Sequence, residues 1–257
     1  MQAELAMTRQ QGRTFNPALF AKAAPAGLSV SPAAGNRIAD MIDDIPLAHR
    51  RLKQGEYLYR AGSEFRYIYV LNAGFAKTCH ASADGREQTT GFHLRGDILG
   101  LDAVATGTYN CDAIALDVCD VLAIPYDVVI ARGMQQPALM RELHCAFSAE
   151  IRSDRDLMLR MGSLPAEGRV AAFLLEMSQR FGSRGFSATR LQLRLTRQEI
   201  GSLLGLKLET VSRAFSRFAK VGLISVHLRD ITLLDVEGLK DMMNITAGHD
   251  AELRAAA

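Results

Sequence analysis

A ridge of charged and hydroxyl side chains follows one face of the segment from residue 208 to 220. Six side chains share this face at helical offsets, namely Glu209, Ser212, Arg213, Ser216, Arg217 and Lys220. Arginine can donate two hydrogen bonds to guanine, glutamate can accept one from the cytosine amino group, and serine can do either. Arg217 and Lys220 lie further along and would meet phosphates, which fix position without reading sequence. The alternative is a solvated face with an ion pair between Glu209 and Arg213.

Two short helices separated by a glycine would position this ridge. Thr196, with Glu199 three residues later, forms a capping box and predicts a helix from about residue 196 to 204. Gly205 permits a sharp turn, and a second helix follows from about residue 208 to 219. The predicted buried stripe of this second helix comprises Leu208, Val211, Phe215 and Phe218. A capped helix, a turn and a basic helix together favour a helix-turn-helix.

Charge is distributed unevenly along the 257 residues, although the net charge is only +2. Between Arg190 and Asp230 there are eight Lys or Arg and three acidic residues, so the remainder is mildly acidic. A basic module on an acidic body is typical of a nucleic-acid binder. The chain has no run of 18 apolar residues and no apolar signal core, so we expect a cytoplasmic protein without a membrane span.

The region from about Pro46 to Pro125 alternates short apolar runs with glycine-containing turns. Strands spaced in this way predict an antiparallel barrel or roll. The predicted strands are residues 67–71, 75–80, 89–93 and 121–124. A short helical pattern, residues 37–45, precedes the region.

Pro137 opens a long helical pattern that ends near residue 161. Apolar residues repeat along it at spacings of three and four, as in a dimerisation seam: Met140, Leu143, Phe147, Ile151, Met158 and Met161. Asp154 falls on the same seam and would face its symmetry mate. Like charges in a desolvated seam are costly, so the hypothesis is that Asp154 keeps a dimer marginal. The alternative is that Asp154 pairs with Arg152 or Arg155 at the rim.

The remaining pattern completes an α+β organisation. A turn at 162–165 precedes a helix at 166–181 and a strand at 191–195, and two strands, 223–227 and 230–234, follow the ridge around a turn at Leu228–Arg229. This predicts a winged helix-turn-helix. The expected domains are a flexible arm (1–35), a β-roll (36–136), a dimerisation helix (137–162), a winged helix-turn-helix (163–236) and a C-terminal tail (237–257).

The segment LTRQEIGSLLGLKLETVSRAFSRF, followed by a glycine-containing hairpin, resembles the DNA-binding domain of the CRP/FNR superfamily of bacterial transcription regulators. The E-x-x-S-R pattern of Glu209, Ser212 and Arg213 resembles the FNR branch. The order GEYLYRAG, LNAGFAK, TTGFHLRGDILGLDA resembles the superfamily's cyclic-nucleotide-binding-type β-roll, and the similarity covers roughly residues 38 to 235. The resemblance implies a homodimeric transcription activator that binds a palindrome with half-sites like TTGAT.

The resemblance also implies contacts with double-stranded DNA and with RNA polymerase. The expected DNA-binding residues are Thr196, Arg197, Lys207, Glu209, Thr210, Ser212, Arg213, Ser216, Arg217 and Lys220. Segments 82–87 and 181–186 are expected to touch RNA polymerase, or else to be ordinary surface loops. Lys207 departs from the family, which usually has Thr or Ser before the recognition helix, where a side chain can cap the first turn.

A cofactor is not expected from the sequence. Between Arg95 and Arg132 there is no Lys or Arg to hold a cyclic phosphate, and there are six aspartates. An iron–sulfur cluster needs converging thiolates, whereas no cysteine precedes Cys79, so the N-terminal cluster cysteines of the FNR branch are missing. We expect Cys79, Cys111 and Cys119 to be buried apolar residues, and we predict no metal site.

Other signals stay open. Haem or nitric-oxide sensing would need an axial ligand such as His80, His93 or His144, and Cys145 is a candidate redox-sensitive thiol. The alternative function is therefore a ligand- or redox-sensing module in which DNA binding is secondary. A protein that senses no ligand would respond to its own concentration through dimerisation. An enzyme is not expected, because no phosphate-binding loop, H-E-x-x-H or G-x-S-x-G motif is present.

Overall fold

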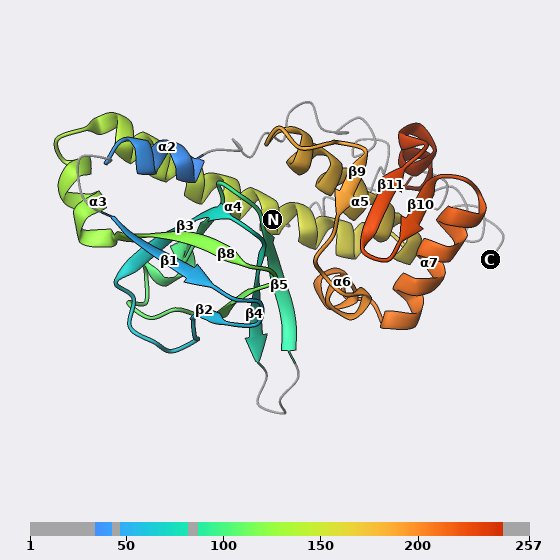
Figure 1. Ribbon diagram of the computed structural model, residues 1–257, viewed down its shortest axis with the longest axis horizontal. Coiled ribbons are helices and arrows are strands. Elements are labelled where there is room, and N and C mark those ends of the chain that lie inside the picture. The colour runs from blue at the N-terminus through green and yellow to red at the C-terminus, as the bar shows by residue number, and fades with distance from the viewer. Residues whose placement is uncertain (1–33, 43–46, 82–86, 244–257) are drawn as a thin grey trace, which may run out of the picture.

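The protein has two domains at opposite ends of a long helix, α4 (Pro137–Ser163), in a computed structural model that describes residues 34–42, 47–81 and 87–243 (Figure 1). An antiparallel roll lies at one end and a helix-rich domain at the other. The predicted α+β organisation is confirmed. The first 33 residues of the predicted arm lie outside the described residues, and its last two belong to helix α2 (Ala34–Asp40).

Two four-stranded antiparallel sheets form the roll, in the orders β1-β8-β3-β6 and β2-β7-β4-β5. The strands are β1 (Ala48–Leu52), β2 (Tyr57–Tyr59), β3 (Tyr67–Ala73), β4 (Ala76–Ala81), β5 (Glu87–His93), β6 (Ile98–Leu99), β7 (Asp112–Ala115) and β8 (Cys119–Pro125). The four predicted strands are β3, β4, β5 and β8. The other four were missed because β1 exposes nearly all of its side chains and the rest are two to four residues long.

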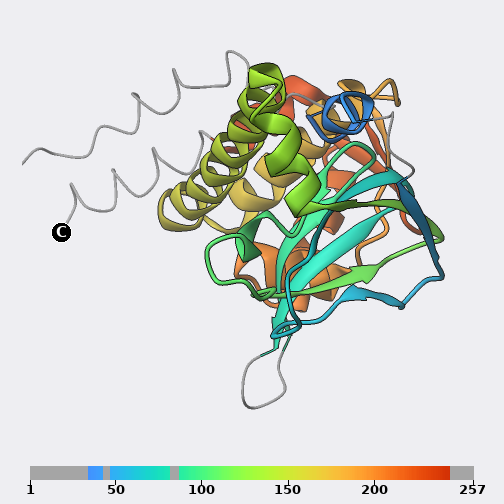
Figure 2. The same ribbon diagram turned by 90° about the vertical axis from the view of Figure 1, so that its left-hand side faces the viewer.

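Three helices cover one side of the roll, as Figure 2 shows. Helices α2, α3 (Tyr126–Gly133) and α4 enclose an apolar cluster that includes Ile38, Val129 and Leu143. Arg37 Nη2 of α2 lies 2.7 Å from the carboxylate of Glu142 on α4, which adds a charged hydrogen bond at the edge of the cluster. Helix α2 ends at Asp40, earlier than the predicted helix of residues 37–45.

The C-terminal domain is a winged helix-turn-helix, as predicted. Its elements are α5 (Ala166–Gly182), β9 (Arg190–Gln192), α6 (Arg197–Leu204), α7 (Leu208–Lys220), β10 (Ile224–His227) and β11 (Asp230–Leu233). The three strands form a sheet in the order β10-β11-β9. Leu239 is buried in the domain core, so the domain continues past the predicted boundary at residue 236.

The two domains share one buried core. Phe92 and Leu94 of the roll belong to the same apolar cluster as Phe181 of α5. The ring of Phe75, before β4, has its centroid 5.9 Å from that of Phe92 and 6.1 Å from that of Phe181. Aromatic pairs at such distances contribute beyond their buried area. The roll is therefore packed against the C-terminal domain and not only tethered through α4.

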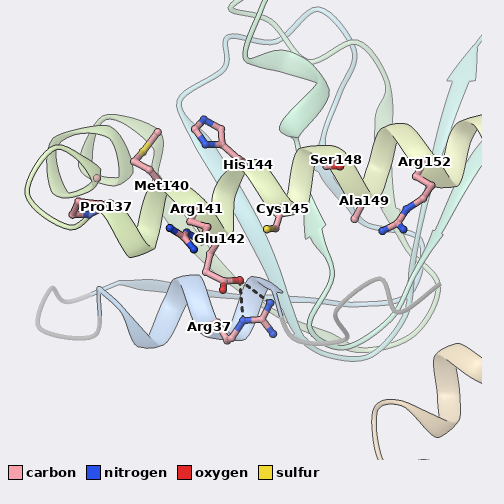
Figure 3. A pocket seen from close by; sticks show the side chains of 11 residues that line it. Arg37, Pro137, Met140, Arg141, Glu142, His144, Cys145, Ser148, Ala149 and Arg152 are labelled. Atoms are coloured by element: carbon pink, nitrogen blue, oxygen red, sulfur yellow. Dashed lines mark hydrogen bonds and ion pairs between the residues drawn. The ribbon is translucent and has the colours of Figure 1, made fainter. Parts of the chain in front are cut away.

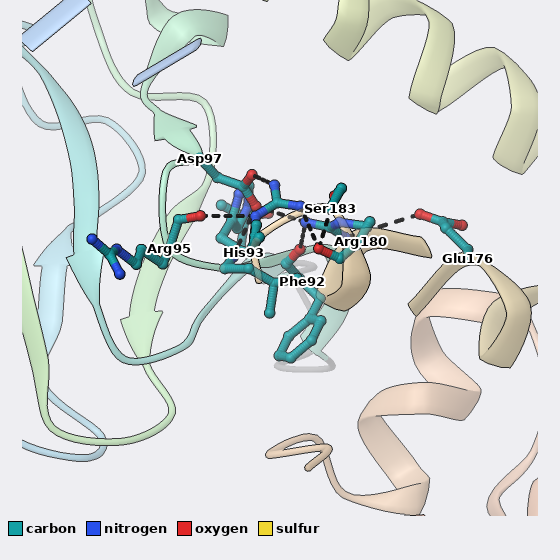
Figure 4. A network of polar contacts seen from close by, with 10 residues as sticks. Phe92, His93, Arg95, Asp97, Glu176, Arg180 and Ser183 are labelled. Carbon is teal, nitrogen blue, oxygen red and sulfur yellow. Dashed lines mark hydrogen bonds and ion pairs between the residues drawn. The ribbon is translucent and has the colours of Figure 1, made fainter. Parts of the chain in front are cut away.

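A polar network closes this interface (Figure 4). Asp97 of the roll accepts hydrogen bonds from Arg180 of α5, at 2.6 Å, and from Arg184, which follows α5. Arg180 also donates to the carbonyl oxygen of Phe92 at 2.7 Å. His93 sits beside this network with Nε2 3.2 Å from Thr78 Oγ1, and burial lowers its pKa to about 4. His93 is therefore a neutral structural residue of the interface at physiological pH.

Candidate nucleic-acid interface

The capping box predicted at the start of α6 is present. The backbone N of Glu199 donates to Thr196 Oγ1 at 3.2 Å, and the backbone N of Thr196 donates to Glu199 Oε2 at 2.7 Å. Gly205 ends α6 with φ 65°, the left-handed conformation that glycine adopts without strain. A Cβ on Gly201 would lie 2.6 Å from the carbonyl oxygen of Leu206. The close packing of the turn on α6 therefore requires glycine at position 201.

Helix α7 buries one face and exposes the other. Its buried residues are Val211, Ala214, Phe215 and Phe218. Leu208 was predicted in this stripe, but 43% of it is exposed. It lies at the edge of the stripe, and as the first helical residue it has no preceding turn to cover it.

The predicted ridge lies on the exposed face of α7. Its exposed residues are Glu209, Arg213, Ser216, Arg217 and Lys220. Thr210 and Ser212 beside them are half-buried. Arg217 Nη1 lies 2.7 Å from the carboxylate of Glu167 on α5, so this arginine is oriented by the protein itself. No ion pair joins Glu209 and Arg213 among the described residues, and both side chains remain free to meet a partner.

The two remaining cations of the predicted set have different surroundings. Lys207 is the exposed N-cap residue of α7 and makes no side-chain cap. The first N–H groups of α7 are therefore not capped by that residue and could bind an anion such as phosphate. The guanidinium of Arg197 lies 3.4 Å from the ring centroid of Phe215, and burial lowers its pKa. The guanidinium of Arg197 therefore packs on the buried face of α7 and not on its exposed ridge. The side chain of Thr196 is used as the N-cap of α6.

The wing between β10 and β11 turns at Leu228 and Arg229, as predicted. Leu228 has φ 56° and is the one non-glycine residue with positive φ in the described part of the chain. It is also 85% exposed, so no packing compensates for the strained backbone.

Leu228→Asn is expected to stabilise the protein, because asparagine tolerates the left-handed conformation better than leucine. The free energy of unfolding should rise by about 0.5–1 kcal/mol in urea titrations. Leu234→Asn is the matched control, since Leu234 is exposed at ordinary φ and should change stability little. Equal changes in the free energy of unfolding for the two substitutions would show that the backbone conformation of Leu228 is not strained.

The exposed face of α4 carries an open groove of about 830 Å³ (Figure 3). Its lining includes Arg37, Met140, Arg141, His144, Cys145 and Arg152. Leu143, predicted in the dimerisation seam, is 1% exposed and packs into the roll, because the N-terminal half of α4 turns that side toward α2. Met140 and Phe147 also pack partly against that cluster.

The C-terminal half of α4 leaves most of its predicted seam open. Ile151, Asp154 and Met158 are exposed in the protomer. Met161 is partly exposed, and its methyl group approaches Gly205 at the turn between α6 and α7. The open part of the seam is thus shorter than predicted and begins beyond Phe147.

The residues present do not fit an iron–sulfur cluster. Cys79, Cys111 and Cys119 are buried, as predicted, and Cys145 is exposed on α4. Burial raises the pKa of Cys79 to about 11 and of Cys111 to about 12, so both are protonated thiols in a largely apolar setting. Among the described residues, no three His, Cys, Asp or Glu side chains form a metal-binding group.

The space between the sheets of the roll also fits a cyclic nucleotide poorly. Stacked tyrosines fill part of it, with the rings of Tyr59 and Tyr109 4.0 Å apart and those of Tyr59 and Tyr69 5.7 Å apart. Charges of both signs border these rings: Asp102, an exposed residue, lies 3.7 Å from Cys111 Sγ, and the guanidinium of Arg50 lies 5.9 Å from the ring centroid of Tyr69. For haem, His80 and His144 are exposed, whereas His93 is held at the domain interface.

One of the two segments expected to touch RNA polymerase, 181–186, is partly buried, whereas residues 82–86 of the other lie outside the described residues. Phe181, within the segment expected to touch RNA polymerase, is 4% exposed, whereas Phe186 is 47% exposed. Phe181 packs against Phe75, so burial at the domain interface removes it from any external partner.

Among the described residues, no helix combines the length and the apolar character that a membrane span requires.

Sequence comparisons agree with this architecture. Residues 49–132 match the cyclic nucleotide-binding domain family, and residues 168–242 match the Crp-like helix-turn-helix domain family. The chain is 41% identical over 196 residues to the transcriptional activator protein anr of Pseudomonas aeruginosa, covering 76% of this chain and 80% of the relative. It is 36% identical over 210 residues to the fumarate and nitrate reduction regulatory protein of Escherichia coli, covering 82% of each.

A structural comparison gives the same answer. FixK2 from Bradyrhizobium japonicum superposes with a TM-score of 0.71 at 30% sequence identity, covering 77% of this chain and 98% of FixK2. Roll, long helix and winged helix-turn-helix thus occur together in a solved relative. The relatives at this identity are transcription regulators and not enzymes. The chain belongs to the CRP/FNR family of transcription regulators, in its FNR-like branch.

Proposed function

We propose that the protein binds a palindromic DNA site with half-sites like TTGAT as a homodimer and activates transcription there. The observation that carries this proposal is the exposed ridge of α7, in which Glu209 and Arg213 extend from a helix braced by the capped α6. In a twofold dimer, two such helices enter successive major grooves about 34–36 Å apart. Ser212 and Ser216 add hydroxyls to the base-reading set, and Arg217, Lys220 and Lys207 contact phosphates.

Fluorescence anisotropy with two duplexes tests this proposal. One duplex carries the palindrome and the other a scrambled sequence of the same length, both titrated at several salt concentrations. Preference for the palindrome and a steep fall in affinity with salt are expected. Binding that ignores both sequence and salt would favour the alternative function, a ligand- or redox-sensing module in which DNA binding is secondary.

The open half of the α4 seam supports the homodimer. Ile151 and Met158 are large apolar residues left exposed at a spacing of seven, as in a coiled coil. The dimerisation surface proposed here therefore consists of Ile151, Asp154 and Met158, with the groove beside Cys145 continuing it toward α2. Asp154 is exposed in the protomer, but partial desolvation by its neighbours already raises its pKa, and a second copy of this carboxylate would add like-charge repulsion.

Asp154→Ala is expected to tighten dimerisation. Removing the repulsion between two facing carboxylates should lower the dimer dissociation constant by roughly tenfold, about 1–2 kcal/mol. Sedimentation velocity over a range of concentrations measures the constant. Asp156→Ala removes the same charge two residues away, off the seam, and should leave dimerisation unchanged. An unaltered association constant for Asp154→Ala would show that this carboxylate is instead neutralised at the rim.

The protein also contacts RNA polymerase and acts in the cytoplasm without a bound cofactor under this proposal. Phe186 is the exposed aromatic residue of the expected polymerase segment. The lack of converging metal-ligand side chains among the described residues and the stacked tyrosines support the proposed absence of a cluster or cyclic nucleotide. An absorption spectrum of anaerobically purified protein tests this, because a visible band would indicate a cluster or haem.

A further inference from the structure

The edge strand of the roll contacts the first helix of the helix-turn-helix. Strand β5 is the last strand of its sheet, so one side of its backbone is free of strand partners. The backbone N of Thr89 donates to Ser202 Oγ at 2.8 Å, and Ser202 Oγ donates to the carbonyl oxygen of Glu87 at 3.3 Å. The side chain of Gln88 donates to the carbonyl oxygen of Ser202. Helix α6 therefore covers the edge of the sheet.

Lys77 of β4 supplies the charge in this contact. Its Nζ lies 2.8 Å from Glu199 Oε1 and 3.2 Å from Glu87 Oε2, and its side chain is only 10% exposed. Burial lowers the pKa of Lys77, but the hydrogen bonds and charges of the two glutamates outweigh it and raise the pKa overall. The ammonium is therefore charged, and it is matched by carboxylates on both sides.

Each carboxylate oxygen of Glu199 has its own role, one in the capping box of α6 and one in the contact with the roll. Oε2 accepts the hydrogen bonds of the capping box from Thr196, and Oε1 accepts that of Lys77. Ser202 lies three residues later and so shares this face of α6. Two contacts link α6 to α7: the backbone of Leu206 packs closely on Gly201 of α6, and the guanidinium of Arg197 of α6 stacks on the ring of Phe215 of α7. A displacement of α6 therefore also moves α7.

We propose that Lys77 is a positioning residue for DNA recognition: through Glu199, and beside the separate contacts of Ser202 with β5, it holds the helix-turn-helix at a fixed orientation to the roll. The proposal rests on the proposed palindromic binding. The contact leaves the ridge of α7 exposed, so the docked arrangement is compatible with DNA. In a dimer, two docked domains present their recognition helices at one separation, whereas loosened domains must be ordered when they bind, which lowers affinity.

Lys77→Met tests the proposal through its effect on half-site spacing. Anisotropy titrations use palindromes at the optimal spacing and at one base pair more and less, together with a duplex that carries a single half-site. Wild-type protein should prefer one spacing. The variant should bind that duplex about tenfold more weakly, which corresponds to about 1.4 kcal/mol, and should discriminate less among spacings. Binding to the single half-site should be unchanged.

Three further variants make the result specific. Lys77→Arg keeps the charge and should restore the spacing preference. Ser202→Ala removes the two hydrogen bonds of the Ser202 hydroxyl with β5 but leaves the cap of Glu199 intact, and should shift affinity and spacing preference in the same direction as Lys77→Met. Lys53→Met removes the same charge from an exposed turn of the roll and should resemble the wild type.

The outcomes separate the inference from the proposed function. An equal loss for the palindrome and the single half-site would mean that Lys77 only maintains the fold of the helix-turn-helix, and would overturn the inference. An unchanged spacing preference in Lys77→Met would overturn it as well. If the wild-type protein showed no preference for any palindrome over scrambled DNA, the proposed function would fail, and the inference with it.

Discussion

Arg213→Ala is expected to weaken binding to the palindromic site and to relax discrimination at one guanine of each half-site. A bidentate contact between arginine and guanine contributes about 1–3 kcal/mol of discrimination, so the affinity for the correct half-site should fall by roughly 5- to 150-fold. Replacing that guanine in the duplex should then reduce the DNA affinity of the variant only slightly. Anisotropy titrations against duplexes that are substituted at each half-site position measure both effects.

The surroundings of Arg213 explain this expectation. It is exposed on α7, one helical turn after Glu209, and among the described residues no carboxylate pairs with it. Arg217, one turn further, is already bound by Glu167 at 2.7 Å. A guanine edge would therefore meet Arg213 without first displacing a protein partner, whereas a phosphate at Arg217 would compete with a carboxylate.

Lys220→Ala provides the matched control for Arg213. Lys220 lies on the same ridge in the last turn of α7, where a phosphate contact is expected. The substitution should weaken all sequences about equally and reduce the slope of log affinity against log salt by roughly one. If both substitutions had equal effects on every duplex, the ridge would not be oriented as proposed.

The helix-turn-helix could be predicted because its signals are local. Thr196 and Glu199 are three residues apart and form the cap by themselves, and Gly205 alone permits the turn. The apolar spacing of α7 then determines which face is exposed. Local signals failed at the ends of elements, as at Leu208, and in short strands such as β6, which has too few residues to show a period.

The docking of the domains could not be predicted, because its partners are distant in sequence. Lys77 and Glu199 are 122 residues apart, and no spacing rule connects a strand lysine to the cap of a remote helix. Leu143 shows the same limit in another form. Its spacing on α4 is the same for a helix that packs on its own roll and for one that packs on a second copy, so periodicity does not identify the partner.

Asp97→Asn is expected to have the largest effect on stability among the substitutions considered. Asp97 accepts hydrogen bonds from Arg180 at 2.6 Å, from Arg184, and from the backbone N of Leu94 at 2.8 Å. Its side chain is 12% exposed and that of Arg184 only 3%. Removing one partner of a buried ion pair leaves the other charge without compensation, which costs about 3–5 kcal/mol.

The pKa of Asp97 gives the sign of a related pH dependence. Burial raises this pKa, but the charges of Arg180 and Arg184 outweigh burial and lower it below the ordinary value. The stabilisation by Asp97 is therefore complete above the ordinary pKa of aspartate and is lost as the pH falls through the lowered value. Asp97→Asn should remove this contribution, so the stability of the variant should depend less steeply on pH in the acid range.

Urea unfolding at neutral pH measures the effect, and Asp117→Asn is its control. Asp117 also joins the two domains, at 2.9 Å from Arg194, but its side chain is 35% exposed, so its loss should cost under about 1 kcal/mol. Since Asp97 pairs with Arg180 and Arg184 at the contact between roll and α5, its replacement should also separate the unfolding of the domains into two transitions. A single transition with a loss as small as that of Asp117→Asn would show that the shared apolar core alone couples the domains.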